Sequence, residues 1–177
     1  MIAIRPGTAE DMEAIVGVHF AAFPTDAEAR LVQALCVGGK AVVSLVAGVA
    51  GTIVGHVLFT PVWIDSEPGS SLGVGLAPLA VLPAQQRRGI GGRLVEAGLE
   101  ACRRAGLGFA VVLGEPDYYG RFGFRHARTR GLGNEYGVDE AFMVLELRPG
   151  ALAGVSGVVR YSSEFDALAT GERGKIP

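Results

Sequence analysis

Apolar positions recur at helical spacing in two segments near the start of the chain. Residues 2–5 form a short strand pattern, and Thr8 then precedes a segment whose first turn carries three acids. Acids suit the positive end of a helix dipole. Apolar residues recur at helical spacing up to residue 20 and again over residues 26–36, which Gly38 follows. The pattern predicts one strand followed by two helices.

A run of β-branched and alternating residues comes next and predicts a sheet. Short turns separate the segments 41–47, 52–64 and 72–82, which favours three neighbouring antiparallel strands. Residues 90–105 place apolar side chains along one helical face, and a glycine ends this helix. The continuous apolar run 109–114 is typical of a strand buried in the centre of a sheet. These elements predict a mixed α/β fold.

The last third of the chain has weaker periodicity. A short helix near residues 116–122 leads to a strand near Phe124, and residues 141–147 form another strand pattern after a glycine-rich loop. Residues 151–166 are predicted to pack as an irregular extension, and the polar last ten residues are expected to fray. We therefore expect one domain over residues 1–148, with a C-terminal extension, residues 149–177, packed on it.

Composition limits the classes of function. A chain of 177 residues with 49% apolar side chains can bury a core without disulfides or a structural metal, and Cys36 and Cys102 are expected to be reduced. The formal charge of -2 argues against nucleic acid and anionic membranes as partners. The N-terminus reaches charged residues before any long apolar stretch, which predicts neither a signal peptide nor a membrane anchor and favours a cytoplasmic protein.

The most informative segment joins the third strand of the predicted sheet to the long helix. No acid occurs between Glu67 and Glu96, although helix N-termini ordinarily attract acids. Glycines at a helix start let backbone N–H groups approach an anion closely. The segment therefore predicts a bound anion the size of a diphosphate, and a glycine turn with solvated arginines is the alternative. Its glycines and arginines are Arg87, Arg88, Gly89, Gly91, Gly92 and Arg93.

Two motifs point to acyl-CoA. Residues 86–91, QRRGIG, fit the acyl-CoA signature [Q/R]-x-x-G-x-[G/A], whereas the phosphate-loop pattern GxxxxGK[ST] does not occur in the sequence. Residues 119–124, YGRFGF, fit the pattern Y-x-x-x-G-F. With the order of elements over residues 2–148, these motifs make the chain resemble the GNAT superfamily of N-acetyltransferases. The segments GEPDYYGRFGF and ELRPGALAGVSGVVRY further resemble its YhbS-like branch of small bacterial proteins.

The resemblance implies a GNAT-type fold, in which a central, mostly antiparallel twisted sheet is flanked by helices and holds acyl-CoA in a cleft at splayed strands. The loop backbone would bind the CoA diphosphate, and a neighbouring strand would pair with the pantetheine arm and stabilise the thioester oxyanion. Tyr119 would donate a proton to the leaving thiolate. The implied cofactor-binding residues are Leu79, Ala80, Val81, Arg87, Arg88, Gly89, Ile90, Gly91, Gly92, Tyr118 and Tyr119.

The chain departs from the family at Gly114, close to where many members place an asparagine that contacts CoA. No motif identifies the general base. Glu28 lies where the acceptor cleft of the family opens, although an acid at a helix start is more often solvated. His56 lies within a strand, where a core position is the commoner one. A bound water is the third alternative.

The resulting hypothesis is an acyl-CoA-dependent N-acetyltransferase that moves acetyl from acetyl-CoA to a primary amine by direct attack in a ternary complex. A non-catalytic acyl-CoA sensor with the same fold is the alternative function. For the oligomeric state, both a monomer and a homodimer of this chain are considered. We expect no metal, because His19, His56 and His126 are scattered along the sequence.

A hydrolase is a weaker alternative. Residues 69–73 match GxSxG around Ser71, and Asp117 and His126 follow in the order of a catalytic triad. The serine of such a motif must follow a strand and precede a helix, whereas Ser71 follows a loop and precedes a strand pattern.

Overall fold

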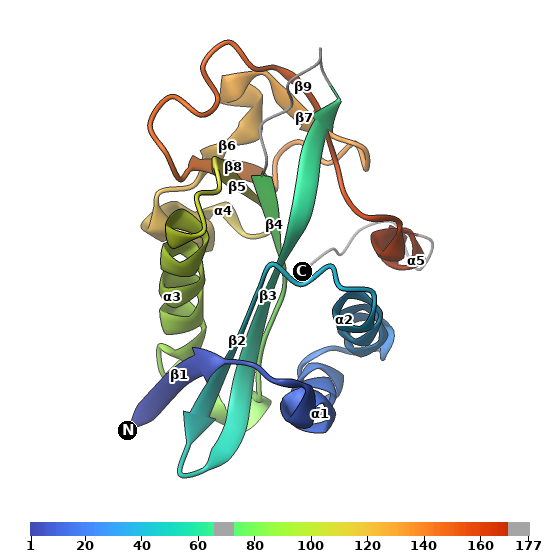
Figure 1. Cartoon of the computed structure of the whole chain (residues 1–177), viewed down its shortest axis with the longest axis vertical. Coiled ribbons are helices and arrows are strands. Elements are labelled where there is room, and N and C mark those ends of the chain that lie inside the picture. The colour runs from blue at the N-terminus through green and yellow to red at the C-terminus, as the bar shows by residue number, and fades with distance from the viewer. Residues whose placement is uncertain (66–72, 170–177) are drawn as a thin grey trace.

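The computed structural model describes residues 1–65 and 73–169, in which a twisted sheet separates two groups of helices (Figure 1). The main sheet has the strand order β1-β2-β3-β4-β5-β8-β6. Neighbouring strands are antiparallel except β4 and β5, which are parallel. The strands are β1 (Ile2–Pro6), β2 (Val43–Val49), β3 (Thr52–Asp65), β4 (Gly73–Val81), β5 (Phe109–Leu113), β6 (Arg125–His126) and β8 (Phe142–Glu146). The mostly antiparallel sheet expected from the sequence is confirmed.

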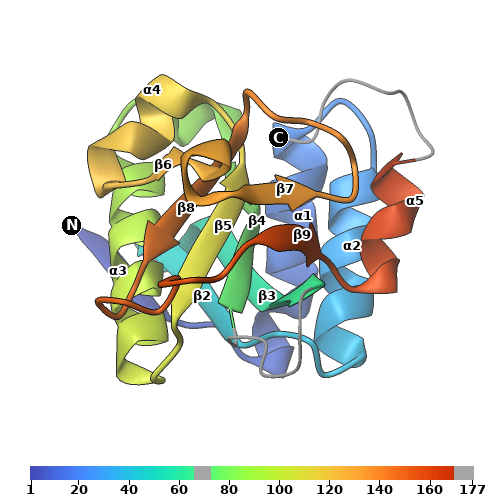
Figure 2. The ribbon, with the colours of Figure 1, turned by 90° about the horizontal axis from the view of Figure 1, so that it is seen from above.

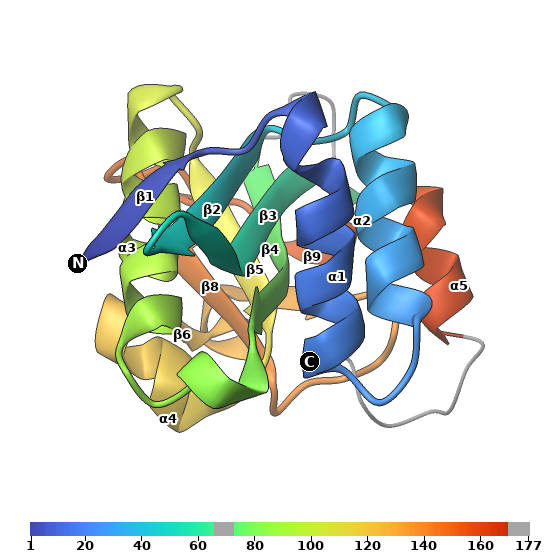
Figure 3. The same ribbon diagram turned by 90° about the horizontal axis from the view of Figure 1, so that it is seen from below.

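Helices cover both faces of the sheet, as the views from above and below show (Figures 2 and 3). α1 (Met12–Ala22), α2 (Ala27–Val37) and the short α5 (Asp166–Ala169) lie on one side, and α3 (Ile90–Arg104) and α4 (Pro116–Tyr119) lie on the other. The buried apolar residues accordingly form two clusters. The described chain also contains five short 3-10 helices: η1 (Ala9–Asp11), η2 (Pro83–Gln85), η3 (Gly120–Phe122), η4 (Ala127–Arg130) and η5 (Ser163–Phe165).

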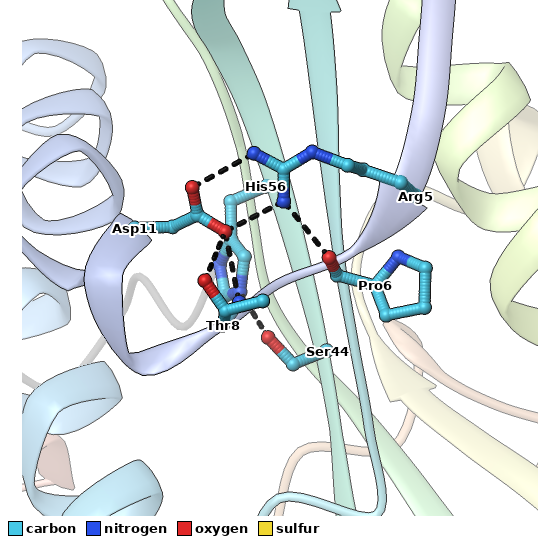
Figure 4. Close-up of polar contacts among 6 residues, drawn as sticks. All are labelled: Arg5, Pro6, Thr8, Asp11, Ser44 and His56. Carbon is cyan, nitrogen blue, oxygen red and sulfur yellow. Dashed lines mark hydrogen bonds and ion pairs between the residues drawn. The ribbon is translucent and has the colours of Figure 1, made fainter.

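An ion pair holds the end of β1 against the start of the first helical segment (Figure 4). Arg5 donates to both oxygens of Asp11, at 2.6 and 2.8 Å. The backbone N–H of Thr8 also donates to this carboxylate, at 2.8 Å. These hydrogen bonds, the one from Arg5 above all, hold the pKa of Asp11 well below its usual range. One of the acids predicted for this helix start, Asp11, therefore has a structural role.

β4 and β5 separate along their length. Their pairing covers only Gly73–Gly75 and Phe109–Val111, at the beginning of each strand. No further pairing joins the two strands in the described residues, so their carboxyl ends, at Val81 and Leu113, diverge. β4 stays paired to β3 on its other side, with a bulge where Val57 faces Leu79 and Phe59 faces Leu76. The backbone at the end of β4 thus has one free edge.

The C-terminal region differs from the prediction. The segment expected to be irregular contains β9 (Gly157–Arg160), which pairs antiparallel with residues 63–65 at the end of β3. The predicted glycine-rich loop contains β7 (Leu132–Asn134), which pairs parallel with β9. α5 then packs against α2. Short glycine-containing segments carry too little periodicity to reveal strands whose partners lie far away in sequence.

Cys36 and Cys102 are both free cysteines. Every helix in the part of the chain that the structure describes is too short or too polar to cross a lipid bilayer.

Candidate active site

A cleft of about 920 Å³ lies between the end of β4, the start of α3 and α4. It contains most of the residues that the two sequence motifs single out. Its lining residues are Leu79, Val81, Gln85, Gln86, Arg87, Gly89, Ile90, Gly91, Gly92, Arg93, Glu96, Asp117, Tyr118, Arg121 and Phe122.

The turn into α3 has an unusual backbone. Arg87 and Gly89 both have positive φ angles, of 59° and 78°, and Gly89 is the N-cap of the helix. A non-glycine residue in this region is strained by roughly 1–2 kcal/mol. Gln86 secures the turn, because its amide donates a hydrogen bond of 3.0 Å to the carbonyl of Val81 at the end of β4. The first turn of α3 contains no acid. No carboxylate of this turn therefore competes for the N–H groups at the helix start, which favour an anion.

Gly91 is a close-approach position in the cleft. A Cβ built on Gly91 would lie 2.9 Å from the hydroxyl oxygen of Tyr118 and 3.8 Å from Val81. Any side chain here would therefore have to displace the phenol or fill the cleft beside the helix start. The glycine at this position thus makes room for the Tyr118 hydroxyl at the start of α3.

Arg121 and Phe122 extend the cleft beyond the residues that the sequence identified. The guanidinium of Arg121 lies 4.5 Å from the ring centroid of Tyr118, and its Nε donates to the Tyr118 carbonyl at 3.2 Å. With Arg87 and Arg93, three arginines line the cleft, together with the acids Glu96 and Asp117. The only sequence signal for Arg121 was its place within the Y-x-x-x-G-F motif.

Tyr119 is buried behind the cleft, whereas Tyr118 lines it. The ring centroids of Tyr119 and Phe124 are 5.8 Å apart, and burial raises the pKa of Tyr119 well above its usual value. The Tyr119 ring also occupies the space that a Cβ on Gly114 would need. This contact explains why the chain has glycine near the family's asparagine position, because a side chain there would collide with the tyrosine.

The other candidate residues lie outside the cleft lining. Ala80 is buried in the sheet, and the Arg88 guanidinium donates to the Gln85 side chain at 2.5 Å. Glu28 is in the first turn of α2 and only 8% exposed, with the Thr25 hydroxyl 3.5 Å from its carboxylate. The interpretation of Glu28 as a solvated helix-start acid is therefore wrong.

His19 and His56, which the sequence separates, form a buried histidine pair. His19 Nε2 lies 2.8 Å from His56 Nδ1, and His56 Nε2 lies 3.0 Å from the Ser44 hydroxyl (Figure 4 shows the second contact). Burial lowers the pKa of His19 to about 4, and burial followed by the charge of His19 lowers that of His56 to about 3. The core position favoured for His56 is confirmed. His19 and His56 are scattered in the sequence but meet in the structure, whereas His126 is not part of this pair.

Within residues 1–65 and 73–169, no three histidine, cysteine or acidic side chains gather in a way that could hold a metal ion. Two members of the triad considered for a hydrolase can be located. Ser71 lies outside the described residues, and Asp117 lines the cleft between β4, α3 and α4.

The fold and the cleft agree with a family assignment by sequence. The sequence profile of the acetyltransferase (GNAT) family matches residues 11–124, and the chain belongs to this family. It is 38% identical to the protein named uncharacterized N-acetyltransferase YhbS of Escherichia coli (strain K12), over 81% of this chain and 86% of that one.

Two solved structures of similar proteins were determined with ligands. The chain matches Escherichia coli YhbS in complex with CoA with a TM-score of 0.88 and 36% identity, covering 93% of this chain and 92% of that one. It matches a GNAT family acetyltransferase from Brucella melitensis in complex with acetyl-CoA with a TM-score of 0.78 and 33% identity, covering 94% and 99%. The predicted GNAT-type fold and its YhbS-like branch are thereby confirmed.

Proposed function

We propose that this protein transfers an acetyl group from acetyl-CoA to a primary amine by direct attack in a ternary complex. The observation that carries the proposal is the absence of a side chain at Gly91. This glycine belongs to a helix start without acids, and it lines a large cleft beside the free edge of β4. The two relatives solved with CoA and with acetyl-CoA support the same ligand.

The CoA diphosphate fits the start of α3. The N–H groups of residues 87–92 and the dipole of a helix that begins at Ile90 favour negative charge, and Arg87 and Arg93 add positive charge to the same cleft. The missing Cβ of Gly91 lets a phosphate approach the backbone. Tyr118, whose hydroxyl lies at this glycine, can donate a hydrogen bond to the same ligand.

The pantetheine arm fits the free edge of β4. Leu79 and Val81 line the cleft, and beyond Gly75 the described part of β5 no longer pairs with this strand. An amide-rich arm can complete the backbone hydrogen bonds in the manner of an added strand. Such pairing would bring the thioester to the point where β4 and β5 diverge, where an N–H of β4 can stabilise the oxyanion.

The chemistry needs two proton transfers. The amine nitrogen attacks the thioester carbonyl, the tetrahedral intermediate collapses with cleavage of the C–S bond, and the thiolate takes a proton. We assign this proton to Tyr119, whose ring lies against Gly114 directly after β5 and whose raised pKa keeps it protonated at neutral pH. We assign removal of the amine proton to Glu28, a buried carboxylate on the opposite helical layer.

A thiol-release assay tests the proposal. Acetyl-CoA is incubated with the protein and a panel of primary amines, and free CoA and the acetylated amine are measured together. The proposal predicts equal amounts of the two products and little thiol without amine. Acetyl-CoA binding with no turnover on any amine would favour the sensor interpretation instead.

A further inference from the structure

Positive charge concentrates in the segment that follows the start of α4. Residues 118–134 contain four arginines and no acid, although the whole chain has a formal charge of -2. Arginines elsewhere form close ion pairs, for example Arg5 with an acid at 2.6 Å and Arg160 at 3.1 Å. Within the described residues, this segment has one ion pair, between Arg130 and Glu146, and it is longer, at 3.7 Å. The segment is therefore a place where an anion would be attracted.

Two of these arginines line a pocket at the edge of β8, which we name the β8-edge pocket. It is lined by the charged side chains of Arg125, Arg130 and Glu146 and by the apolar side chains of Val144, Leu145 and Leu152. Its volume of about 210 Å³ has room for several water molecules or for a small organic ion. The pocket shares no described residue with the cleft between β4, α3 and α4. It is thus a separate site.

The pocket begins where β6 stops covering β8. In the described residues, β6 pairs with β8 only at Met143 and Val144. The next two residues of β8, Leu145 and Glu146, therefore border the pocket on this side instead of a strand. A ligand in the pocket would lie beside the open backbone edge of β8.

The two guanidinium groups come from different elements and have donors to spare. Arg125 belongs to β6, and Arg130 ends η4. Arg125 donates to the Phe124 carbonyl at 3.5 Å, which is a weak hydrogen bond, and the 3.7 Å between Arg130 and Glu146 is too long for one. Each guanidinium carries five N–H donors, so most of them are available to solvent or a ligand.

Glu146 does not cancel this charge. Its Oε1 accepts a hydrogen bond of 2.9 Å from the backbone N–H of Leu152, which holds the carboxylate toward the C-terminal extension. Two arginines and one glutamate give the lining a net charge of +1, which suits a monoanion. Guanidinium groups bind a carboxylate through paired N–H donors, and the apolar side chains can cover a short aliphatic body.

We propose that the β8-edge pocket binds a small aliphatic monocarboxylate. The carboxylate lies between Arg125 and Arg130, and the aliphatic body packs on Val144, Leu145 and Leu152. An inorganic anion could use the same arginines but would leave the apolar side chains uncovered. The proposal does not depend on acetyl transfer, because the pocket lies outside the cleft to which that reaction is assigned.

Three small ligands test the class of ligand. These are isovalerate, its uncharged counterpart isovaleramide, and acetate, which lacks the branched aliphatic body. Protein-observed NMR titrations of the whole chain at about 0.15 M salt measure the three Kd values. The proposal predicts saturable binding of isovalerate, with shifts of the Leu145 and Glu146 amides, and a Kd about tenfold or more below those of the other two ligands.

Each comparison among these ligands can fail separately. Absence of saturable isovalerate binding, or an equal Kd for isovalerate and isovaleramide, would overturn the carboxylate site. An equal Kd for isovalerate and acetate would overturn the aliphatic class of the ligand.

Arginine variants locate the site. Arg125→Gln should raise the Kd for isovalerate about tenfold or more, because it removes charge-assisted hydrogen bonds. Arg128→Gln is the matched control, since Arg128 belongs to the same segment and is exposed, but does not line the pocket. It should change the Kd less than about twofold at this salt concentration.

An equal rise in Kd for the two variants would overturn the pocket, because it would show only a general attraction of anions to the segment. An unchanged Kd for Arg125→Gln would overturn it as well. Arg130→Gln, for which the same rise is expected, decides the question if Arg125→Gln does not fold.

Discussion

Replacing Gly91 by valine tests whether the start of α3 is the diphosphate site. The new Cβ would lie 2.9 Å from the Tyr118 hydroxyl, closer than real Cβ contacts, and the two methyl groups would extend into the space proposed for the diphosphate. For the wild-type protein, acetyl-CoA at 100 times its Kd adds about 2.7 kcal/mol to the free energy of unfolding. In a domain of this size that raises Tm by about 5–11 °C.

We expect Gly91→Val to remove nearly all of this shift. A hundredfold rise in Kd leaves about 0.4 kcal/mol at the same ligand concentration, which corresponds to roughly 1 °C. The matched control is Gly17→Val, because Gly17 is also helical and a Cβ there would have no heavy atom within 4 Å. Thermal unfolding with and without acetyl-CoA measures both variants, and Gly91→Ala serves if the valine variant does not fold. A full ligand-induced shift in folded Gly91→Val would refute the diphosphate site.

Further variants test the chemistry and the core. Tyr119→Phe should lower kcat about 10²–10⁴-fold with acetyl-CoA affinity unchanged, whereas Tyr118→Phe should lower kcat less. Equal kcat values for wild type and Tyr119→Phe would exclude Tyr119 as the general acid. Gly114→Ala should lower the free energy of unfolding by about 1–3 kcal/mol in a denaturant titration, because the new Cβ would collide with the Tyr119 ring, and wild-type stability would contradict that contact. Glu28→Gln should lower kcat/KM for an accepted amine about tenfold or more, and an unchanged pH–rate profile would exclude Glu28 as the base. Both histidines of the buried pair have pKa values below 6.5 in the folded state, so the unfolded chain binds more protons below that pH. The free energy of unfolding should therefore fall as the pH drops from about 6.5 toward 4, by about 1.4 kcal/mol per pH unit for each ring. Tm should therefore fall between pH 7 and pH 5, and a folded His56→Gln variant with the same slope would refute this origin.

The main sheet and its large helices could be predicted because their signals are local. α3 combines a glycine start with helical periodicity, and β5 is a continuous apolar run whose five residues are all buried. The cleft could be predicted for the same reason, since its glycines, its arginines and Tyr118 lie in two short motifs or within two residues of them. In such segments local preference and final structure agree.

The missed features depend on contacts between distant parts of the chain. β9 is a strand because residues 63–65 offer it a free edge, and no pattern within GVVR shows this. The contact between His19 and His56 joins positions 37 residues apart. The role of Gly114 depends on where the Tyr119 ring lies, which the motif spacing does not specify.

Transfer of a labelled acetyl group tests the central claim most directly. Acetyl-CoA with an isotopic label in its acetyl group is mixed with excess protein and an accepted amine, and the label is followed by mass spectrometry during a single turnover. The account predicts that the label moves to the amine, one acetyl for each CoA thiol released, without a labelled protein intermediate. Label on a protein side chain, or in free acetate while the amine stays unmodified, would contradict it.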